Sequence, residues 1–226
     1  NSLGMLFASI GINTAILDMT KNKNSYYLST KNDERLRQIA IESTSRLKEG
    51  VAMGVEVLKG LSIYTSLPGV KEEDSDTEVI LSTLVKNYSL VLIDADFDTN
   101  FGYFSAAQEI YLVQSLDVLT IQPLTAFLKE LLDARILTTE KVKVVLNKEV
   151  AVRGLTRKIL VGGISTYNDP GMSIMTNLFD RNQVQVASIP FDQNVYSKYL
   201  ENIVECKYDI SGYPKKFVES LKILAN

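Results

Sequence analysis

Aspartates and an asparagine follow short apolar runs at several places in the chain, and these side chains can serve a metal, a water or a polar ligand. In the segment LVLIDADFD, four apolar residues run into Asp94, and Asp96 and Asp98 follow at alternate positions. Other apolar runs end at Asp18 and Asn147. Carboxylate oxygens are ligands that Mg²⁺ prefers, and an amide offers both a hydrogen-bond donor and an acceptor. The candidates for chemistry are therefore carboxylates and amides at the ends of apolar runs.

The composition excludes several other kinds of site. The 226 residues contain no histidine, so Ser-His-Asp and Cys-His nucleophile arrangements and histidine zinc sites are excluded. Cys206 is the single cysteine, which rules out an internal disulfide, disfavours an iron–sulfur cluster and suits a reducing cytoplasm. The formal charge of −3 is mild, so any contact with nucleic acid or anionic lipid must be local.

Short β-branched runs alternate with longer segments of helical period, and this order is typical of βαβ units around a parallel sheet. The expected strands are 14–18, 61–64, 90–94, 110–113, 142–147 and 184–189. Several are apolar at consecutive positions, as strands are when helices cover both faces of their sheet. We therefore expect an α/β fold: a three-layer, doubly wound, mostly parallel sheet with helices on both faces, built as one domain over residues 1–226.

Apolar stripes at helical spacing predict helices between these strands. One stripe contains Ile80 and Leu84, and a second, over 128–136, follows Thr125 as its expected cap. In the segment NDPGMSIMTNLF, Asp169 is expected to cap a third helix with a proline in its first turn. The inner face of that helix would hold three core residues, namely Met172, Met175 and Phe179.

The remaining polar and apolar stretches bear on location. The polar stretches 21–25 and 69–76 are expected to be surface loops. No stretch approaches the roughly 18 uninterrupted apolar residues of a membrane span. The segment NSLGMLFASIG, at 1–11, lacks the basic flank and the cleavage site of a secretory signal. We therefore expect a cytoplasmic protein.

In parallel α/β sheets, ligands lie beyond the carboxyl ends of the strands, where a buried strand can hold a carboxylate toward a site. Asp94 fits this placement. An acid that ends an apolar strand has the form of a Walker B element, whose carboxylate holds Mg²⁺ through water beside nucleotide phosphates. A strand that ends in a polar turn gives the same pattern, so the strand end alone leaves both interpretations open.

Four segments in a fixed order carry a resemblance to a known family. ASIGINTAILDMT (8–20) reads as a helix, a glycine and a strand that ends in an aspartate, and YSLVLIDAD (88–96) has the Walker B form. KVKVVLNK (141–148) reads as a strand that ends in an asparagine, and ASIPFDQNVYSKYLEN (187–202) contains the pattern IP-x-D-x-x-V. These segments resemble the motifs of the ParA/MinD family of P-loop ATPases with a deviant Walker A motif, CpaE/TadZ-like or related members included, over most of the chain.

The resemblance implies ATP and Mg²⁺ as cofactors and gives a role to each strand end. Asp94 would hold Mg²⁺ through water, and Asp18 would act as the catalytic residue near the γ-phosphate and its water. Asn147 would contact adenine, and the loop that follows would border the base through Pro190, Phe191 and Asp192. A turn-forming role for Asn147 and a loop-breaking role for Pro190 are the simpler alternatives.

The chain departs from the family at the phosphate-binding loop. The family's glycine-rich loop ends in Gly-Lys-Thr or Gly-Lys-Ser and holds the phosphates through its amides and lysine, and the sequence does not contain it. Residues 1–11 match the helix after that loop, so the first strand and the loop are expected upstream of Asn1. A sheet without this central strand would have two unpaired edges, which favours an upstream strand. The alternatives are a degenerate relative and a strand supplied by another chain.

A second departure concerns hydrolysis. The family's second motif usually carries two aspartates one residue apart, and the pattern in this chain is Asp18, Met19, Thr20. A threonine can hydrogen-bond a water but cannot accept its proton, so hydrolysis of ATP to ADP and phosphate is expected to be slow or absent. Asp96 or Asp98 would substitute for the missing acid, or would only solvate the loop.

Three features concern partners. Members of the family dimerise with nucleotide between the subunits, so the resemblance implies a homodimer. A basic cluster over 141–158 would contact DNA nonspecifically or form an ordinary solvated face, with Lys141, Lys143, Lys148, Arg153, Arg157 and Lys158 set against Glu149. A C-terminal apolar stripe would bind a membrane, as relatives of the MinD type do, or pack on the domain, through Phe217, Leu221 and Leu224.

The combined expectation is an ATP-binding, ParA/MinD-like protein that positions a cytoplasmic cargo, such as DNA or a polar or membrane machine, by nucleotide-dependent dimerisation. Its location would be cytoplasmic, with a peripheral place at the membrane or nucleoid. The alternative is a non-hydrolysing pseudo-ATPase scaffold or adaptor of the same fold, and a metabolic ligase of the superfamily is a third hypothesis. A dinucleotide-binding Rossmann protein is disfavoured because no Gly-x-Gly-x-x-Gly follows an expected strand. A receiver domain is disfavoured because the interval from Asp18 to Asp94 is too long for that compact fold.

Overall fold

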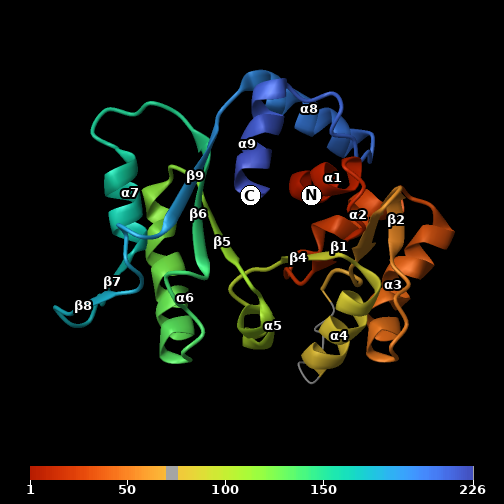
Figure 1. Cartoon of the computed structure of the whole chain (residues 1–226), viewed down its shortest axis with the longest axis horizontal. Coiled ribbons are helices and arrows are strands. Elements are labelled where there is room, and N and C mark those ends of the chain that lie inside the picture. Colours follow the sequence, from red (N-terminus) through yellow and green to blue (C-terminus); the bar gives the residue numbers. More distant parts are fainter. Residues whose placement is uncertain (70–75, 226) are drawn as a thin grey trace. The chain divides into compact units, whose positions relative to one another are not determined.

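The computed structural model of the chain describes residues 1–69 and 76–225. The chain divides into two compact units (Figure 1). The first unit contains residues 1–103 and 194–225, and the second contains residues 104–193. The single domain expected over residues 1–226 stays a prediction.

The first unit is built on a four-stranded sheet in the order β2-β3-β1-β4 (Figure 1). Its strands are β1 (Thr14–Asp18), β2 (Val55–Leu58), β3 (Leu61–Tyr64) and β4 (Leu90–Asp94). β1 pairs in parallel with β3 on one side and with β4 on the other, and β2 runs antiparallel to β3. Gly60, at φ +81°, supplies the left-handed backbone in the short turn between β2 and β3.

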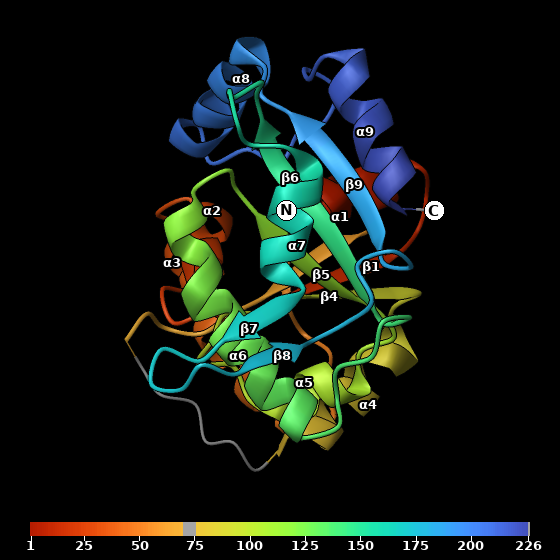
Figure 2. The same ribbon diagram turned by 90° about the vertical axis from the view of Figure 1, so that its left-hand side faces the viewer.

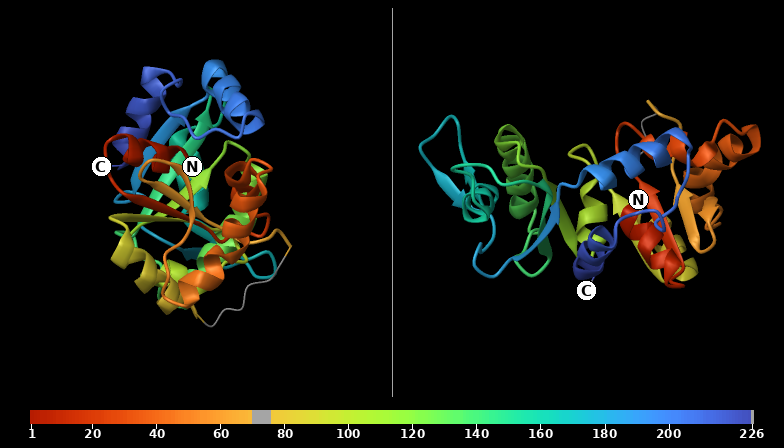
Figure 3. Two further views of the ribbon diagram at one scale, coloured as in Figure 1. Left: turned by 90° about the vertical axis from the view of Figure 1, so that its right-hand side faces the viewer. Right: turned by 90° about the horizontal axis from the view of Figure 1, so that it is seen from above.

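Helices cover both faces of this sheet. They are α1 (Ser2–Ser9), α2 (Asn24–Thr30), α3 (Glu34–Lys48), α4 (Thr77–Asn87), α5 (Phe101–Ala106), α8 (Gln193–Val204) and α9 (Lys215–Ala225), where α5 and α8 include residues at the boundary between the units. Ala15 and Leu17 of β1 pack with side chains of α3 and α4, whereas Ile16, between them, packs with Met5 of α1. Alternate residues of β1 therefore point to opposite helical layers, as the period of a strand requires. Figure 3 shows the two terminal helices of this unit, α1 and α9, beside the marks N and C.

α1 lies unusually close to the sheet. A Cβ atom at Gly4 would lie 2.7 Å from Cδ1 of Ile16 and 3.1 Å from Cδ1 of Leu61. A side chain at position 4 would therefore require Ile16, Leu61 or α1 to shift. On its other side, α1 contacts α9.

The second unit contains a wholly parallel sheet in the order β5-β6-β9, with β5 (Ile110–Gln114), β6 (Val142–Glu149) and β9 (Gln185–Pro190) (Figure 2). It also contains the 3-10 turn η2 (Val118–Thr120), two helices, α6 (Ile121–Asp133) and α7 (Arg157–Ile164), and an antiparallel pair, β7 (Thr166–Asn168) with β8 (Met175–Asn177). Buried side chains of β6, α6 and α7 form much of its interior, among them Val144, Leu146, Leu128, Leu131 and Leu160.

The fold class expected from the sequence is confirmed as a mostly parallel α/β architecture. β1, β3 and β4 begin and end at the predicted residues, and the other predicted strands differ from β5, β6 and β9 by one or two residues at their ends. The strand β2 was not predicted, because four residues beside a tight turn give little periodic signal.

The helix predicted after Asp169 is wrong. The segment forms the hairpin of β7 and β8, and the side chains of Met172 and Met175 are exposed, by 58% and 71%, whereas Phe179 is buried as predicted. The Asp169 carboxylate accepts hydrogen bonds from the amides of Gly171 (2.7 Å) and Met172 (3.1 Å), which closes a turn instead of starting a helix.

Two further expectations need correction or a limit. The second predicted helix, α6, begins at Ile121, so Thr125 lies inside it and bonds the carbonyl of Gln122 (3.0 Å) instead of capping its start. The predicted loop at 21–25 is shorter than expected, because α2 begins at Asn24. Most of the predicted loop at 69–76 lies outside the described residues.

The C-terminal stripe packs on the first unit. Leu221 and Leu224 of α9 are buried, and Phe217 stacks on the ring of Tyr213. Packing was one of the two expectations for this stripe, and it directs those leucines away from solvent. Within residues 1–69 and 76–225, no helix is both long and apolar enough to cross a bilayer.

Candidate functional site

Asp18 and Asp94 lie side by side at the carboxyl edge of the first unit's sheet. The parallel register of β1 and β4 pairs Asp18 with Asp94, and the amide of Met19 donates to the carbonyl of Asp94 at 2.8 Å. In the same register Ile16 pairs with Leu92, and both pack on the α1 side of the sheet. The two carboxylates therefore extend a row whose side chains face α1.

The N-terminal end of α1 lies near these carboxylates. Asn1 is close enough to Asp94 and Asp18 to interact electrostatically with their carboxylates. Protein atoms around the Asp94 carboxyl displace water and raise its pKa, and the charges of Asp18 and Asp96 add to this rise. A helix start carries partial positive charge, so this edge combines two acids with an electropositive helix end.

The carboxylate of Asp18 is buried and fully engaged. Only 1% of the residue is exposed. Its Oδ1 accepts from the amide and the hydroxyl of Thr20, at 3.0 Å and 2.6 Å, and its Oδ2 accepts from the amide of Ser25 at 3.0 Å. Asp18 therefore holds the loop after β1 and the start of α2 in place. The Thr20 hydroxyl donates its hydrogen to Asp18, so it can offer a water only an acceptor.

Lys23 is a site neighbour that sequence reasoning missed. It precedes α2 in a left-handed backbone conformation, with φ 46°, and only 4% of the residue is exposed. Its ammonium donates to the carbonyl of Asp18 at 2.8 Å. A lysine inside a polar KNKN run looks like a surface residue, and no local pattern signals its burial.

Asp96 joins two loops. Its Oδ2 accepts from the amide of Lys21 at 2.6 Å, and its Oδ1 accepts from the amide of Asp98 at 3.0 Å. Thr99 reinforces the junction, because its hydroxyl lies 3.2 Å from the carbonyl of Met19 and 3.3 Å from Oδ1 of Asp96. Asp96 therefore fastens the loop after β4 to the loop after β1, whereas Asp98 makes only an exposed ion pair with Lys21 at 3.7 Å.

Asp94 is exposed, whereas its strand partner Asp18 is buried. Within the described part of the chain, the Asp94 carboxylate accepts no hydrogen bond. No group of three or more acidic, cysteine or histidine side chains that could enclose a metal occurs in the described ranges. A cation here would thus be held by one protein carboxylate, with water and a ligand's oxygens completing its shell, as Mg²⁺ beside phosphates commonly is. The crowding of like charge around Asp94 fits such a cation.

Asn147 and Pro190 occupy the corresponding edge of the second unit. In the register of β6 and β9, Asn147 pairs with Ile189 and Glu149 pairs with Pro190, across a bulge at Lys148, which has φ 57°. The amide of Phe191 donates to the carbonyl of Glu149 at 2.9 Å and keeps the loop after β9 beside β6.

The surface at this edge combines a polar amide with apolar groups. Pro190 is exposed, Phe191 is 42% exposed, and Asn147 and Asp192 are half-buried. A half-buried amide beside exposed proline and phenylalanine can bond the edge of a planar ring and contact its face.

A second pairing missed from the sequence anchors α7 at this edge. The guanidinium of Arg157, the first residue of α7, binds both carboxylate oxygens of Glu149, at 2.8 Å and 2.7 Å. The hydroxyl of Ser188 on β9 donates to the same carboxylate. Hydrogen bonds from Arg157 and Ser188 lower the pKa of Glu149. Ser188 is 39 residues from Glu149 in sequence, and the pairing of β6 with β9 brings these two together.

Several cations of the predicted basic cluster already make contacts inside the second unit. Besides the pair of Arg157 with Glu149, Lys143 pairs with Glu109 at 2.8 Å, and Lys141 donates to the carbonyl of Ser105 at 2.8 Å. These contacts leave less charge for an outside phosphate than the sequence count indicates, and they favour the expectation of an ordinary solvated face.

The predicted site residues thus form two groups, each confined to one unit. The structure brings Asp18 together with Asp94 in the first unit. In the second unit it brings Asn147 together with the loop that begins at Pro190. Each group lies at the carboxyl edge of a parallel sheet, where ligands of α/β proteins bind.

Comparisons with known proteins identify the fold. No protein-family model matches the sequence, and no curated protein matches it significantly. Solved structures do match. A Borrelia burgdorferi B31 protein assigned to plasmid partition and bound to AMPPNP superposes with a TM-score of 0.63 at 13% identity, over 99% of this chain and 90% of that one.

Two other structures match over similar lengths. The septum site-determining protein MinD of Pyrococcus horikoshii OT3, complexed with Mg-ADP, gives a TM-score of 0.63 at 15% identity, over 99% of this chain and 87% of that one. Apo McdA of Cyanthece gives 0.64 at 12% identity, over 100% of this chain and 94% of that one. The chain therefore has the fold of the ParA/MinD ATPases.

Proposed function

We propose that the chain is an ATP-binding, ParA/MinD-like protein that positions a cytoplasmic cargo by nucleotide-dependent dimerisation. The observation that carries this proposal is the pairing of Asp18 with Asp94 at adjacent strand ends, beside the N-terminal end of α1. The fold adds support, because solved proteins with this fold hold AMPPNP and Mg-ADP.

Each residue of the first group has a role in this proposal. Asp94 holds Mg²⁺ through water, because its carboxylate is exposed and accepts no hydrogen bond from the described residues. Bound Mg²⁺ would neutralise charge on the phosphates. Asp18 acts near the γ-phosphate by fixing the loop that carries Thr20, since its own oxygens are engaged with that loop.

The second group recognises the base. Asn147 bonds the edge of adenine, and the loop of Pro190, Phe191 and Asp192 covers the face of the ring. The exposure of Pro190 and Phe191 beside a half-buried amide supports this assignment. It also predicts a preference for adenine over other bases, because an amide reads the pattern of donors and acceptors on the ring edge.

The edge of β4 that faces away from β1 supports the proposal of a further, phosphate-binding strand. β4 pairs with β1 on one side, and no strand among the described residues pairs with its other side. Four apolar residues of β4, Leu90 to Ile93, are only half-buried. A further parallel strand beside β4 would cover these side chains and satisfy the free backbone groups.

Isothermal titration calorimetry with ATP and Mg²⁺ on the full-length protein tests the proposal. We expect binding in the micromolar range, and Asp94→Asn should weaken it about tenfold with Mg²⁺ present and little in EDTA. Asp98→Asn is the matched control, because Asp98 lies in the same loop but makes only an exposed ion pair. The absence of micromolar binding by the unaltered protein would remove the proposal.

A non-hydrolysing scaffold is the second candidate, and the engagement of Thr20 favours it. The Thr20 hydroxyl donates to Asp18 at 2.6 Å, and both oxygens of Asp18 already accept hydrogen bonds from the protein. In this case nucleotide binds without turnover. A phosphate-release assay decides between the candidates: release that Asp18→Ala abolishes would exclude the scaffold, whereas binding without release would support it.

The homodimer and the location are tested separately. Sedimentation of the protein with ADP and with AMPPNP should show a larger species only with AMPPNP if nucleotide drives dimerisation. Binding to DNA is not part of the proposal, because several cations of the basic cluster contact groups within the second unit. Membrane binding is not part of it either, because the apolar stripe of α9 is buried.

A further inference from the structure

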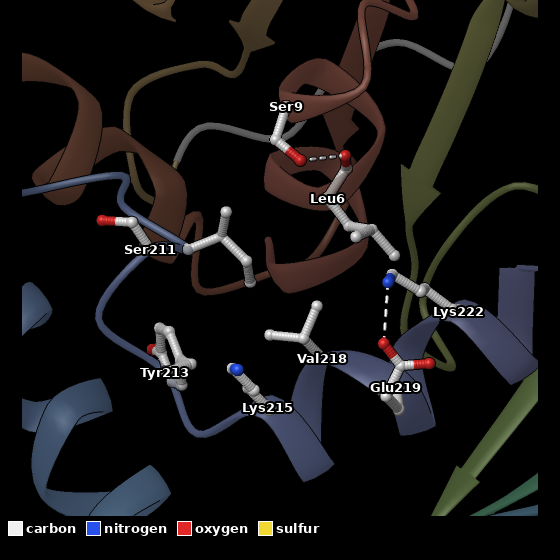
Figure 4. A pocket seen from close by; sticks show the side chains of 9 residues that line it. Leu6, Ser9, Ser211, Tyr213, Lys215, Val218, Glu219 and Lys222 are labelled. Carbon is white, nitrogen blue, oxygen red and sulfur yellow. Dashed lines mark hydrogen bonds and ion pairs between the residues drawn. The ribbon is translucent and has the colours of Figure 1, made fainter.

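A pocket of about 380 Å³ lies within the first unit, between α1, α9 and the segment before α9. Figure 4 shows its lining side chains. It is lined by Leu6, Ser9, Ile210, Ser211, Tyr213, Lys215, Val218, Glu219 and Lys222. Asn1, the end of α1 that lies near Asp18 and Asp94, is not among these residues, so the pocket is separate from the carboxylate edge.

Apolar side chains form opposite walls of the pocket beside polar lining residues, and ring stacking holds part of the lining in place. Leu6 on α1 and Val218 on α9 line opposite walls (Figure 4). Tyr213 stacks on Phe217, with 5.0 Å between ring centroids and 29° between planes, and its hydroxyl lies 3.5 Å from Nδ2 of Asn202. A preformed apolar cavity favours insertion of an apolar side chain, because the walls need not be reordered on binding.

The rim of the pocket is positively charged. Lys215 makes no ion pair within the described part of the chain, and Lys222 pairs with Glu219 at 2.7 Å. Two lysines against one glutamate give this surface a charge opposite to the whole chain, which carries −3. A binding partner that supplies carboxylates would therefore be favoured over a basic one.

Two exposed apolar residues are sequence neighbours of residues that line the pocket. Ile10 directly follows the lining residue Ser9 and is 62% exposed, and Ile223 directly follows the lining residue Lys222 and is 71% exposed. An apolar hollow with neighbouring isoleucines and a cationic rim has the features of a protein interaction site.

We propose that this surface docks an acidic segment of a partner protein, with one apolar side chain inserted in the pocket and neighbouring carboxylates at Lys215 and Lys222. A lipid surface fits less well, because the hollow is concave and the leucines of α9 point inward, whereas a membrane-binding helix presents its apolar face outward. The docking involves no residue of the proposed nucleotide site, so it does not depend on ATP binding.

Selection from a displayed library of random dodecapeptides on the nucleotide-free full-length protein tests the proposal. We expect enriched peptides to carry acidic residues around a leucine or an aromatic residue. By fluorescence anisotropy, Lys215→Glu should weaken the best peptide about tenfold or more, because it reverses a rim charge that faces the ligand. Lys216→Glu, at an exposed neighbour that does not line the pocket, should change its affinity less than about twofold.

Charge reversal provides a second measurement that does not depend on the stability of the variants. A peptide whose acidic residues are replaced by lysine should bind the unaltered protein poorly and bind Lys215→Glu better than the acidic peptide does. Equal weakening by Lys215→Glu and Lys216→Glu would overturn the proposal, because it would indicate only long-range charge.

Three other results would also overturn it. They are no enriched peptide, enrichment of neutral or basic peptides, and stronger binding to phosphatidylglycerol vesicles that Lys215→Glu weakens. Self-association that Lys215→Glu abolishes would assign the surface to a second copy of the chain and would equally refute an acidic partner. ATP titrations of the same variants should match those of the unaltered protein, which separates this inference from the proposed function.

Discussion

In both units parallel strands bring the residues that follow them to one carboxyl edge, and the two edges differ in chemistry. In the first unit the edge carries Asp18 and Asp94, and burial by protein atoms, together with nearby acids, raises the pKa of Asp94. In the second unit the edge carries an amide and apolar loop residues, and the acid Glu149 is paired with Arg157. Backbone pairing therefore sets where a side chain lies, whereas the residues after each strand set whether that place is charged or apolar.

The largest effect is expected from removing the Asp18 side chain, which tests whether this acid holds the edge of the first unit together. Asp18→Ala deletes three hydrogen bonds to backbone and hydroxyl groups and leaves buried donors unpaired. We expect a loss of about 3 kcal/mol in the free energy of unfolding. Urea denaturation measures it. Asp98→Ala, at an exposed acid in the neighbouring loop, should cost less than about 0.5 kcal/mol, and an equal loss in both variants would show that Asp18 has no special structural role.

Asn147 tests whether the amide of the second edge serves the ligand and not the fold. Asn147→Ala should weaken ATP binding by about 1.4 kcal/mol, or about tenfold, through the loss of hydrogen bonds to the base. Calorimetry with ATP and with inosine triphosphate measures the change. The selectivity between the two nucleotides should fall together with the affinity. Unchanged affinity would return Asn147 to a turn-forming role.

Replacing Glu149, the acid of the second unit's edge that pairs with Arg157, should have a smaller effect on stability. Glu149→Gln removes the charge that both nitrogens of Arg157 bind, and we expect a loss of about 1 kcal/mol in stability. The matched control is Glu219→Gln, which breaks an exposed pair with Lys222 and should cost less than about 0.5 kcal/mol. Thermal unfolding of both variants compares them, and similar midpoints would mean that the bidentate geometry contributes nothing.

The last prediction sharpens the contrast through pH. Because the pKa of Asp94 is raised, the folded chain binds a proton more readily than the unfolded chain does, and this contribution to stability is lost as pH rises through the folded pKa. Without ligand, Asp94→Asn should therefore raise the unfolding midpoint slightly at pH 7, and the gain should vanish at about pH 3, below the ordinary carboxyl pKa. A lower unfolding midpoint of Asp94→Asn at pH 7 would contradict a raised pKa of Asp94 in the folded chain.

Strand ends were predictable, because a buried apolar run that stops at an acid marks both the strand and its carboxyl edge. β1 and β4 illustrate this, since both end at the predicted aspartates. The hairpin of β7 and β8 was not predictable, because the carboxylate of Asp169 can accept amides two and three residues later in a turn as well as at a helix start.

Contacts made across the fold were also hidden from the sequence. Glu149 follows a bulge in β6, and Arg157, which binds it, is the first residue of α7. The sequence around neither residue indicates this pair. Lys23 is buried before α2, where its ammonium bonds the carbonyl of Asp18, and its sequence neighbours do not indicate this burial. Pattern reasoning locates elements, whereas partners of charged side chains depend on the packed structure.

The missing side chain at Gly4 sets a limit on how this unit can vary. A Cβ there would lie 2.7 Å from Cδ1 of Ile16, so either Ile16 or α1 would have to shift to make room for a methyl group. If α1 shifts, its first residue moves relative to the acids at the ends of β1 and β4. Natural variants should therefore carry a side chain at position 4 only where position 16 has become smaller.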